Sequence, residues 1–225
     1  MTTPAHVLAA SAVLSGILLG QAAPSVNEDP THKRLLFTAH LRMFDVTVAP
    51  GGSTLDHSHD HDLVTVTVGQ ATLRTRAAGG EWSEPRPVAS GTVDVGSFTG
   101  SSAVHGIENV GTTPYRAFAI ENLRDAKWTT PQLITAPGTT LLEQSRSFAV
   151  YDVRLNGAAS KTNHVHQQPT VVMLMAGAVE VQGGGGESVF RMESPGRWIL
   201  SQWDQPHTLT LVGSGDVHVV EVEAR

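Results

Sequence analysis

Histidine is the residue type whose placement in this chain could do chemistry. The sequence has 11 histidines in 225 residues, and six of them form two sets of the same pattern. Each set is a His-x-His pair followed some 40 to 50 residues later by a third histidine; the sets are His57, His59 and His105, and His164, His166 and His207. Residues i and i+2 of a strand point to the same face, so each pair presents two imidazoles side by side. Neutral imidazole is a ligand for zinc, iron, copper and nickel. Three protein ligands leave coordination positions open, as in catalytic metal sites.

The two sets belong to an internal duplication. Phe44-Asp45-Val46 matches Tyr151-Asp152-Val153, and at the same spacing the first His-x-His pair matches the second. One inserted residue later Gly69 matches Gly177, and the segment YRAFAIE (115–121) matches VHVVEVE (217–223). Because both halves repeat the same order of strand, histidine pair, strand, glycine, histidine and strand, we expect two metal sites in two similar domains.

The elements that must position these histidines are predicted to be strands. From Arg34 onward, short runs of alternating apolar residues are separated by Gly, Pro, Ser and Asp; examples are 43–48, 63–68, 151–155 and 217–223. This pattern is typical of a β-sandwich or barrel. We therefore predict an all-β protein with one barrel over 35–125, a linker over 126–140 and a second barrel over 141–225.

With these motifs in place, the chain resembles the cupin superfamily, and specifically a bicupin. The first cupin motif is matched by Gly51, His57, His59 and Gly69, and the end of the second motif by His105-Gly-Ile-Glu-Asn109. In the second half the matching residues are Gly157, His164, His166, Gly177 and Pro206-His207. The resemblance implies two tandem jelly-roll barrels, each with a metal held inside its mouth.

The sequence departs from the cupin pattern at the glutamate of the first motif. Counting back from Gly69 places Asp62 there, on the strand face shared by Val64 and Val66, and the short gap after His59 makes His61 a rival. Either residue is a candidate fourth ligand or general base. The equivalent position in the second half is assigned to Thr170, which has no carboxylate, so three histidines and solvent are expected there. Among cupins, three-histidine sites resemble those of several iron-dependent dioxygenases, and sites with the acid resemble those of oxalate decarboxylases, germins and quercetinases.

The resemblance favours a metal-dependent enzyme that acts on a small organic molecule. The preferred form is a non-haem Fe(II)-type dioxygenase, and manganese, zinc, nickel or copper are the other candidate metals. Two alternatives stay open: a redox-neutral lyase, isomerase or decarboxylase, and a non-catalytic bicupin that binds a metal or small ligand. One fold hosts many chemistries, so the residues alone do not choose between them.

Composition narrows the partners and the compartment. The formal net charge of −6 argues against nucleic acid, whose binding needs a basic face, and the absence of cysteine excludes disulfides and thiolate metal sites. The apolar run 7–20 is shorter than the roughly 20 residues of a membrane-spanning helix, and small residues follow it. We therefore expect a signal peptide over 1–23, a polar linker over 24–34 and an exported protein in the periplasm or outside the cell. A cytoplasmic protein is the alternative, no transmembrane segment is expected, and a homodimer is left open.

Overall fold

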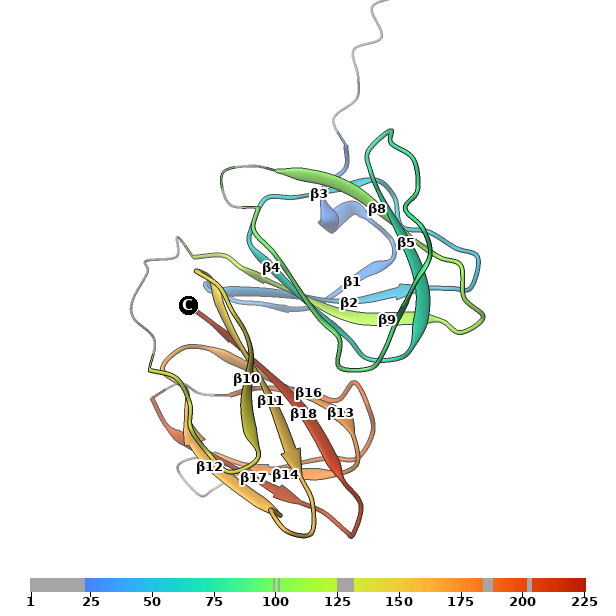
Figure 1. Cartoon of the computed structure of the whole chain (residues 1–225). Coiled ribbons are helices and arrows are strands. Elements are labelled where there is room, and N and C mark those ends of the chain that lie inside the picture. The colour runs from blue at the N-terminus through green and yellow to red at the C-terminus, as the bar shows by residue number, and fades with distance from the viewer. Residues whose placement is uncertain (1–22, 99, 101, 125–131, 184–187, 202–203) are drawn as a thin grey trace, which may run out of the picture.

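The computed structural model describes residues 23–98, 100, 102–124, 132–183, 188–201 and 204–225. They form two β-barrels, one built from the N-terminal half of the chain and one from the C-terminal half (Figure 1). A single 3₁₀ turn, η1 (Val26–Glu28), accompanies the strands of the described residues. The prediction of an all-β chain with two tandem barrels is confirmed. The predicted signal peptide falls almost wholly on residues outside the described ranges and stays a prediction.

Each barrel combines a five-stranded and a four-stranded sheet, and every strand pairing is antiparallel. In barrel 1 the larger sheet has the order β1 (His32–Phe37), β2 (Leu41–Val48), β9 (Tyr115–Asn122), β4 (Leu63–Thr67), β7 (Val93–Gly96). The smaller sheet has the order β3 (His57–His59), β8 (Ala103–Asn109), β5 (Ala71–Ala77), β6 (Arg86–Val88).

Barrel 2 repeats this arrangement strand for strand. Its larger sheet has the order β10 (Thr139–Gln144), β11 (Phe148–Leu155), β18 (Val217–Ala224), β13 (Thr170–Ala176), β16 (Trp198–Ser201). Its smaller sheet has the order β12 (Lys161–Val165), β17 (Pro206–Leu211), β14 (Val179–Gln182), β15 (Val189–Met192). The sheet order therefore supports the duplication that the repeated motifs predict.

The larger sheets of the two barrels pack against each other, and strand alternation separates two kinds of core. On β9, Phe118 and Ile120 belong to an apolar cluster that also contains Val220 and Val222 of β18, so this face forms the seam between the barrels. The intervening residues Ala117 and Ala119 belong to the interior of barrel 1. Both faces of these strands are buried, and only the interior face can contribute to a site inside a barrel.

The N-terminal boundary differs from the prediction, because residues 24–34 are not a linker. The backbone at Ser25 bridges to Ser58, Val26 and Asp29 are buried, and β1 begins at His32. The polar composition of this stretch misled the prediction, because the carboxylate of Asp29 is buried and accepts hydrogen bonds from Thr31 and Leu55. At the second joint, 125–131 lie outside the described residues, and residues 139–140 already belong to β10.

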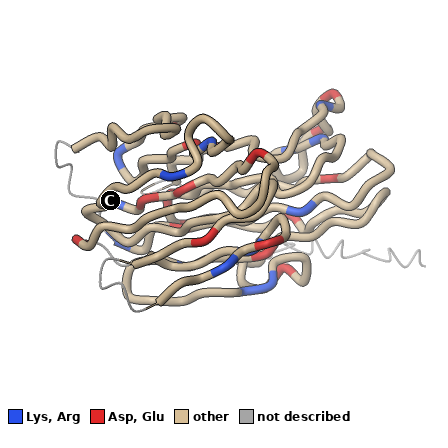
Figure 2. Tube along the Cα trace, turned by 90° about the horizontal axis from the view of Figure 1, so that it is seen from below, with Lys and Arg blue, Asp and Glu red and all other residues tan. Residues whose placement is uncertain are grey.

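In the view of Figure 2, acidic and basic residues are scattered among one another, and no basic face is seen. Within the part of the chain that is described, no helix has the length and apolar character needed to cross a membrane. The expectation that the protein does not bind nucleic acid stays a prediction.

Candidate metal centres

The first histidine set converges inside barrel 1. His57 and His59 lie on β3, and His57 pairs directly with His105 on the neighbouring strand β8. The Nε2 atoms of His57 and His59 are 3.1 Å apart, and the ring of His105 lies 5.0 Å and 5.1 Å from their rings. One ring nitrogen from each of the three fits within a 4.8 Å group. The spacing of the sequence motif therefore brings three imidazoles to one point.

Two buried carboxylates orient the His-x-His pair through the Nδ1 atoms of its rings. Asp29 Oδ2 lies 2.9 Å from His57 Nδ1, and Glu121 Oε1 lies 3.2 Å from His59 Nδ1. Burial by itself raises the pKa of both carboxyls, but hydrogen bonds from His32 and His57 to Asp29, and from His59 and Arg42 to Glu121, outweigh it and lower both pKa values. The carboxylates stay ionised and favour the tautomers that direct Nε2 toward a common centre, as the partners of metal-binding histidines do.

His32 gives this site a fourth neighbouring imidazole. Its ring lies 4.6 Å from that of His57, and Asp29 stands between the two residues. Asp29, His32 and His57 also form a group whose ligand atoms lie within 4.8 Å. Both oxygens of Asp29 already accept hydrogen bonds from Thr31 and Leu55, so we assign the carboxylate to the support of His57.

His105 is the member of the trio that meets a hollow in the barrel. Burial and the neighbouring imidazoles of His59 and His57 lower the pKa of His105 to about 4, so it is neutral at pH 7. It lines a pocket of about 400 Å³ together with Thr65 and Thr67 of β4 and Tyr115 of β9. A small molecule in this pocket would lie against a metal-binding face.

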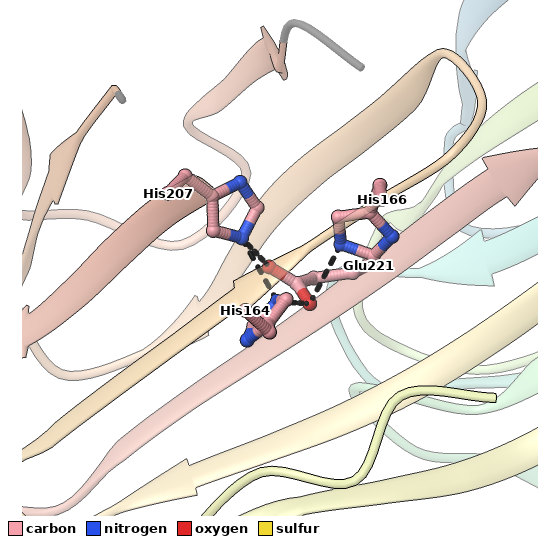
Figure 3. Close-up of side chains that lie close together, drawn as sticks. All are labelled: His164, His166, His207 and Glu221. Atoms are coloured by element: carbon pink, nitrogen blue, oxygen red, sulfur yellow. Dashed lines mark hydrogen bonds and ion pairs between the residues drawn. The ribbon is translucent and has the colours of Figure 1, made fainter. Parts of the chain in front are cut away.

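The second histidine set converges inside barrel 2 around a carboxylate (Figure 3). His164 lies on β12, His166 just beyond its end and His207 on β17, opposite His164. Glu221 of β18 lies between them: its Oε2 is 2.8 Å from His164 Nε2 and 3.3 Å from His166 Nε2, and its Oε1 is 3.0 Å from His207 Nε2. All four residues are buried. The site therefore offers three histidines and one glutamate.

At the second site, the charges of the histidines and the glutamates stabilise one another. Burial opposes a charge on His166, but Glu221 and Glu223 outweigh it and raise the pKa of His166 to about 9. Burial also opposes a charge on Glu221, yet its hydrogen bonds with the three histidines keep its pKa well below the usual range. Glu223 lies 2.9 Å from His166 Nδ1 and supports that ring as Glu121 supports His59.

The residues present fit a bound cation at both centres. Two ligands that bind one ion at about 2.1 Å and at right angles lie about 3.0 Å apart. The Nε2 pair of His57 and His59 at 3.1 Å, and that of His164 and His207 at 2.9 Å, match this spacing. Lone pairs that face each other at this distance repel unless a cation or proton lies between them. In barrel 2, the buried carboxylate of Glu221 lies among the three imidazoles, so this centre also offers a negative charge to a cation.

Asp62 and His61 do not join the first cluster. Asp62 Oδ1 accepts a hydrogen bond of 2.8 Å from the backbone N–H of Phe98, and Oδ2 accepts one from the hydroxyl of Ser147 in barrel 2. The period of two explains the error: Asp62 shares its strand face with Val64, and that face turns toward the seam between the barrels. His61 lies in the bend between β3 and β4 and is half-buried. Among the described residues, neither side chain belongs to a group that could hold a metal ion.

The matching position in barrel 2 also needs correction. Leu63 pairs with Glu121, and Thr170 pairs with Glu223, so Thr170 corresponds to Leu63. Asp62 therefore corresponds to Pro169. The extra residue of the second half lies later, where a bulge at Leu174–Ala176 interrupts the register of β13.

The carboxylates that serve the two centres come from strands or segments that the motifs do not contain. The sequence did contain a sign that Glu221 and Glu223 face the interior. In VHVVEVE they fall on the same strand face as Val217 and Val219, which line the interior of barrel 2. Glu121 occupies the position equivalent to Glu223. No such sign existed for Asp29, because nothing in the polar N-terminal sequence indicates that this residue is buried.

Comparison with known proteins places the chain by fold. No family model and no curated protein matches the sequence. Among solved structures, the protein Ylba from E. coli matches with a TM-score of 0.63 at 10% identity, over 92% of this chain and 88% of that one. A salicylate 1,2-dioxygenase from Pseudaminobacter salicylatoxidans matches with a TM-score of 0.62 at 10% identity, over 85% and 75%. A cupin 2 conserved barrel domain protein from Leptotrichia buccalis matches with a TM-score of 0.56 at 10% identity, over 86% and 88%. The chain has the cupin fold in tandem, as the sequence motifs predict.

Proposed function

We propose that this two-barrel cupin is a metal-dependent enzyme that acts on a small organic molecule in barrel 1, in the manner of a non-haem Fe(II)-type dioxygenase. One observation carries the proposal: three imidazole side chains converge beside a pocket of about 400 Å³, and one of them, His105, lines it. Three protein ligands leave positions where a substrate and a second reactant can meet. Similarity to a salicylate 1,2-dioxygenase structure supports oxygen chemistry as the leading form.

A bound divalent ion would supply polarisation of oxygen atoms and, as iron, access to O₂ chemistry. The chain supplies the remaining parts. His57, His59 and His105 would hold the ion, while Asp29 and Glu121 fix the ring orientation of two of them. The pocket walls orient the substrate against His105, and the barrel shields the centre from bulk water.

Barrel 2 is proposed to hold its ion for stability rather than for turnover. Its four candidate ligands include Glu221, and apolar side chains fill the interior above them. A smaller hollow of about 290 Å³ reaches His164, but it is lined by residues 132–135 and by Asn163, Val165 and Gln167 rather than by the interior. A site with four protein ligands has fewer positions open to reactants.

Two double variants test this proposal: His57→Ala with His59→Ala, and His164→Ala with His166→Ala. The protein is loaded with Fe(II) without oxygen, and oxygen uptake is measured with a panel of small aromatic and hydroxylated substrates. We expect each variant to lose about half of the bound metal. Turnover should fall to background in the first variant only, whereas the second should unfold at lower temperature and keep turnover of the folded fraction within about threefold.

Other results would redirect the assignment. Product formation without oxygen uptake, with manganese as the effective metal, would indicate a redox-neutral lyase, isomerase or decarboxylase; an oxalate decarboxylase is also among the similar structures. Metal binding without turnover of any substrate in the panel would favour a binding protein. Equal loss of turnover in both variants would contradict the division between the barrels.

A further inference from the structure

The pocket of barrel 1 has a lining that its counterpart in barrel 2 does not share. Thr65 and Thr67 of β4 pair with Ala119 and Ala117 of β9, and all four residues lie on the interior side. At the equivalent positions of β13 and β18, Val172 pairs with Glu221 and Leu174 with Val219. Threonine and alanine in place of valine, leucine and glutamate both open the pocket and give its wall hydroxyl groups.

The charged side chains around this pocket are already paired with each other. Arg76 donates hydrogen bonds of 3.1 Å and 3.2 Å to the two oxygens of Asp56, and its guanidinium lies 4.5 Å over the ring of Trp82. At the edge, Arg86 lies 3.6 Å from Asp94. A ligand with a net charge would therefore meet arginine and aspartate side chains that already have a partner of opposite charge, whereas a neutral ligand needs no such partner.

The second pair also marks the entrance. Arg86 is on β6 and Asp94 on β7, and these are the terminal strands of the two sheets of barrel 1. Their ion pair therefore connects the edge strands of the two sheets at one opening of barrel 1. Deeper in the pocket, the buried phenol of Tyr115 hydrogen-bonds with Thr67, and burial raises its pKa to about 12, so this group also stays uncharged at pH 7.

We infer that the pocket selects a small uncharged molecule with hydrogen-bonding groups, held by Thr65 and Thr67 against His105, and that the Arg86–Asp94 pair disfavours anions. This inference names the substrate class of the proposed active site and therefore rests on the proposed function. The hydroxyls of the two threonines can donate or accept, so amides, alcohols and phenols all suit the wall.

Benzamide and benzoate provide matched probes, because they have nearly the same shape and differ in charge. Their binding to the zinc-loaded protein is measured by calorimetry, since zinc prevents redox turnover. Benzamide is expected to bind at least tenfold more tightly than benzoate. The substitution Asp94→Asn leaves Arg86 without its partner and should raise benzoate affinity about tenfold.

The threonine wall is tested by Thr67→Leu, which copies the second barrel, and by Thr65→Val, which removes a hydroxyl while keeping the shape. Thr67→Leu should lower benzamide affinity at least tenfold, and Thr65→Val about threefold to tenfold, with zinc content unchanged in both. Thr47→Leu, at an exposed position of β2, is the matched control and should leave binding unchanged.

Tighter binding of benzoate by the parent protein, or full benzamide binding by Thr67→Leu, would overturn the inference. A failure of the proposed function looks different. The protein would then bind benzamide selectively and yet turn over nothing in the oxygen-uptake panel, and the charge preference would stand. Conversely, turnover of anionic substrates together with preferred benzoate binding would overturn the charge preference alone.

Discussion

The two barrels share their strand order and their histidines but differ in what surrounds the candidate metal. Where barrel 2 has Glu221, barrel 1 has Ala119, and where barrel 2 has Val172 and Leu174, barrel 1 has Thr65 and Thr67. The first barrel thus keeps a pocket next to its histidines, and the second fills its interior. A few side chains on two adjacent strands therefore give the two candidate centres different surroundings on the same scaffold.

The largest effects are expected from substitutions at Glu221 and Ala119, which occupy equivalent positions in the two barrels. Glu221→Ala should lower metal affinity in barrel 2 at least a hundredfold and destabilise the metal-loaded protein by about 3–5 kcal/mol, because it leaves buried positive charge without its partner. Ala119→Glu should place a fourth ligand in barrel 1, raise its metal affinity and abolish turnover. Metal titration and thermal unfolding measure both variants. Turnover that survives Ala119→Glu would show that the open centre is not what distinguishes barrel 1.

The supporting carboxylates should have a smaller effect that stays within each barrel. Asp29→Asn should weaken metal binding in barrel 1 about 10–100-fold, because His57 then loses the anionic partner that orients its ring. Glu223→Gln should do the same in barrel 2 through His166. Competition with a metal chelator measures the affinities, and each variant serves as the control for the other. Loss of metal from both barrels in either variant would contradict two independent centres.

The two centres should also differ in pH dependence. Since the pKa of His166 is raised to about 9, the metal-free second centre carries a proton at pH 7 that an incoming ion must displace. Its metal affinity should therefore rise with pH, up to about tenfold per unit, between pH 7 and pH 9. His105, with its pKa lowered to about 4, is already neutral and should release no proton. Calorimetry of the two double-histidine variants in buffers of different ionisation enthalpy counts the protons.

The raised pKa of His166 also predicts how the stability of the metal-free protein depends on pH. A group whose pKa is raised on folding stabilises the folded state fully below its unfolded pKa of about 6.5, and this contribution is lost as the pH rises through 9. Thermal unfolding of the metal-free protein should therefore show barrel 2 becoming less stable from pH 6.5 to pH 9. An unchanged melting temperature over this range would contradict the His166 assignment.

The smallest effect on metal is expected at Asp62. Asp62→Ala removes the acceptor for Phe98 N–H and the Ser147 hydroxyl, so it should destabilise the protein by about 1–3 kcal/mol. Metal content should be unchanged, because Asp62 faces the seam. Loss of one ion per chain would restore the ligand role that the motif suggested.

The sequence by itself determined the features that depend on local geometry. Alternation along single strands identified the all-β class, and the His-x-His spacing placed pairs of imidazoles on one face. The repeated order of motifs predicted two equivalent barrels, and the structure has both. These predictions succeed because the period of two in a strand does not depend on what lies around it.

Tertiary structure decided which face is the interior and which strands meet there. Asp62 had a suitable side chain at nearly the right place in the motif, but the packing of one barrel on the other turned its face toward the seam. Glu221 lies far along the chain from His164 and reaches it only because β18 crosses the same barrel. Asp29 reaches His57 because the N-terminal segment folds into the barrel mouth. Such contacts follow from sheet order and from barrel-on-barrel packing, which join residues that no local spacing connects.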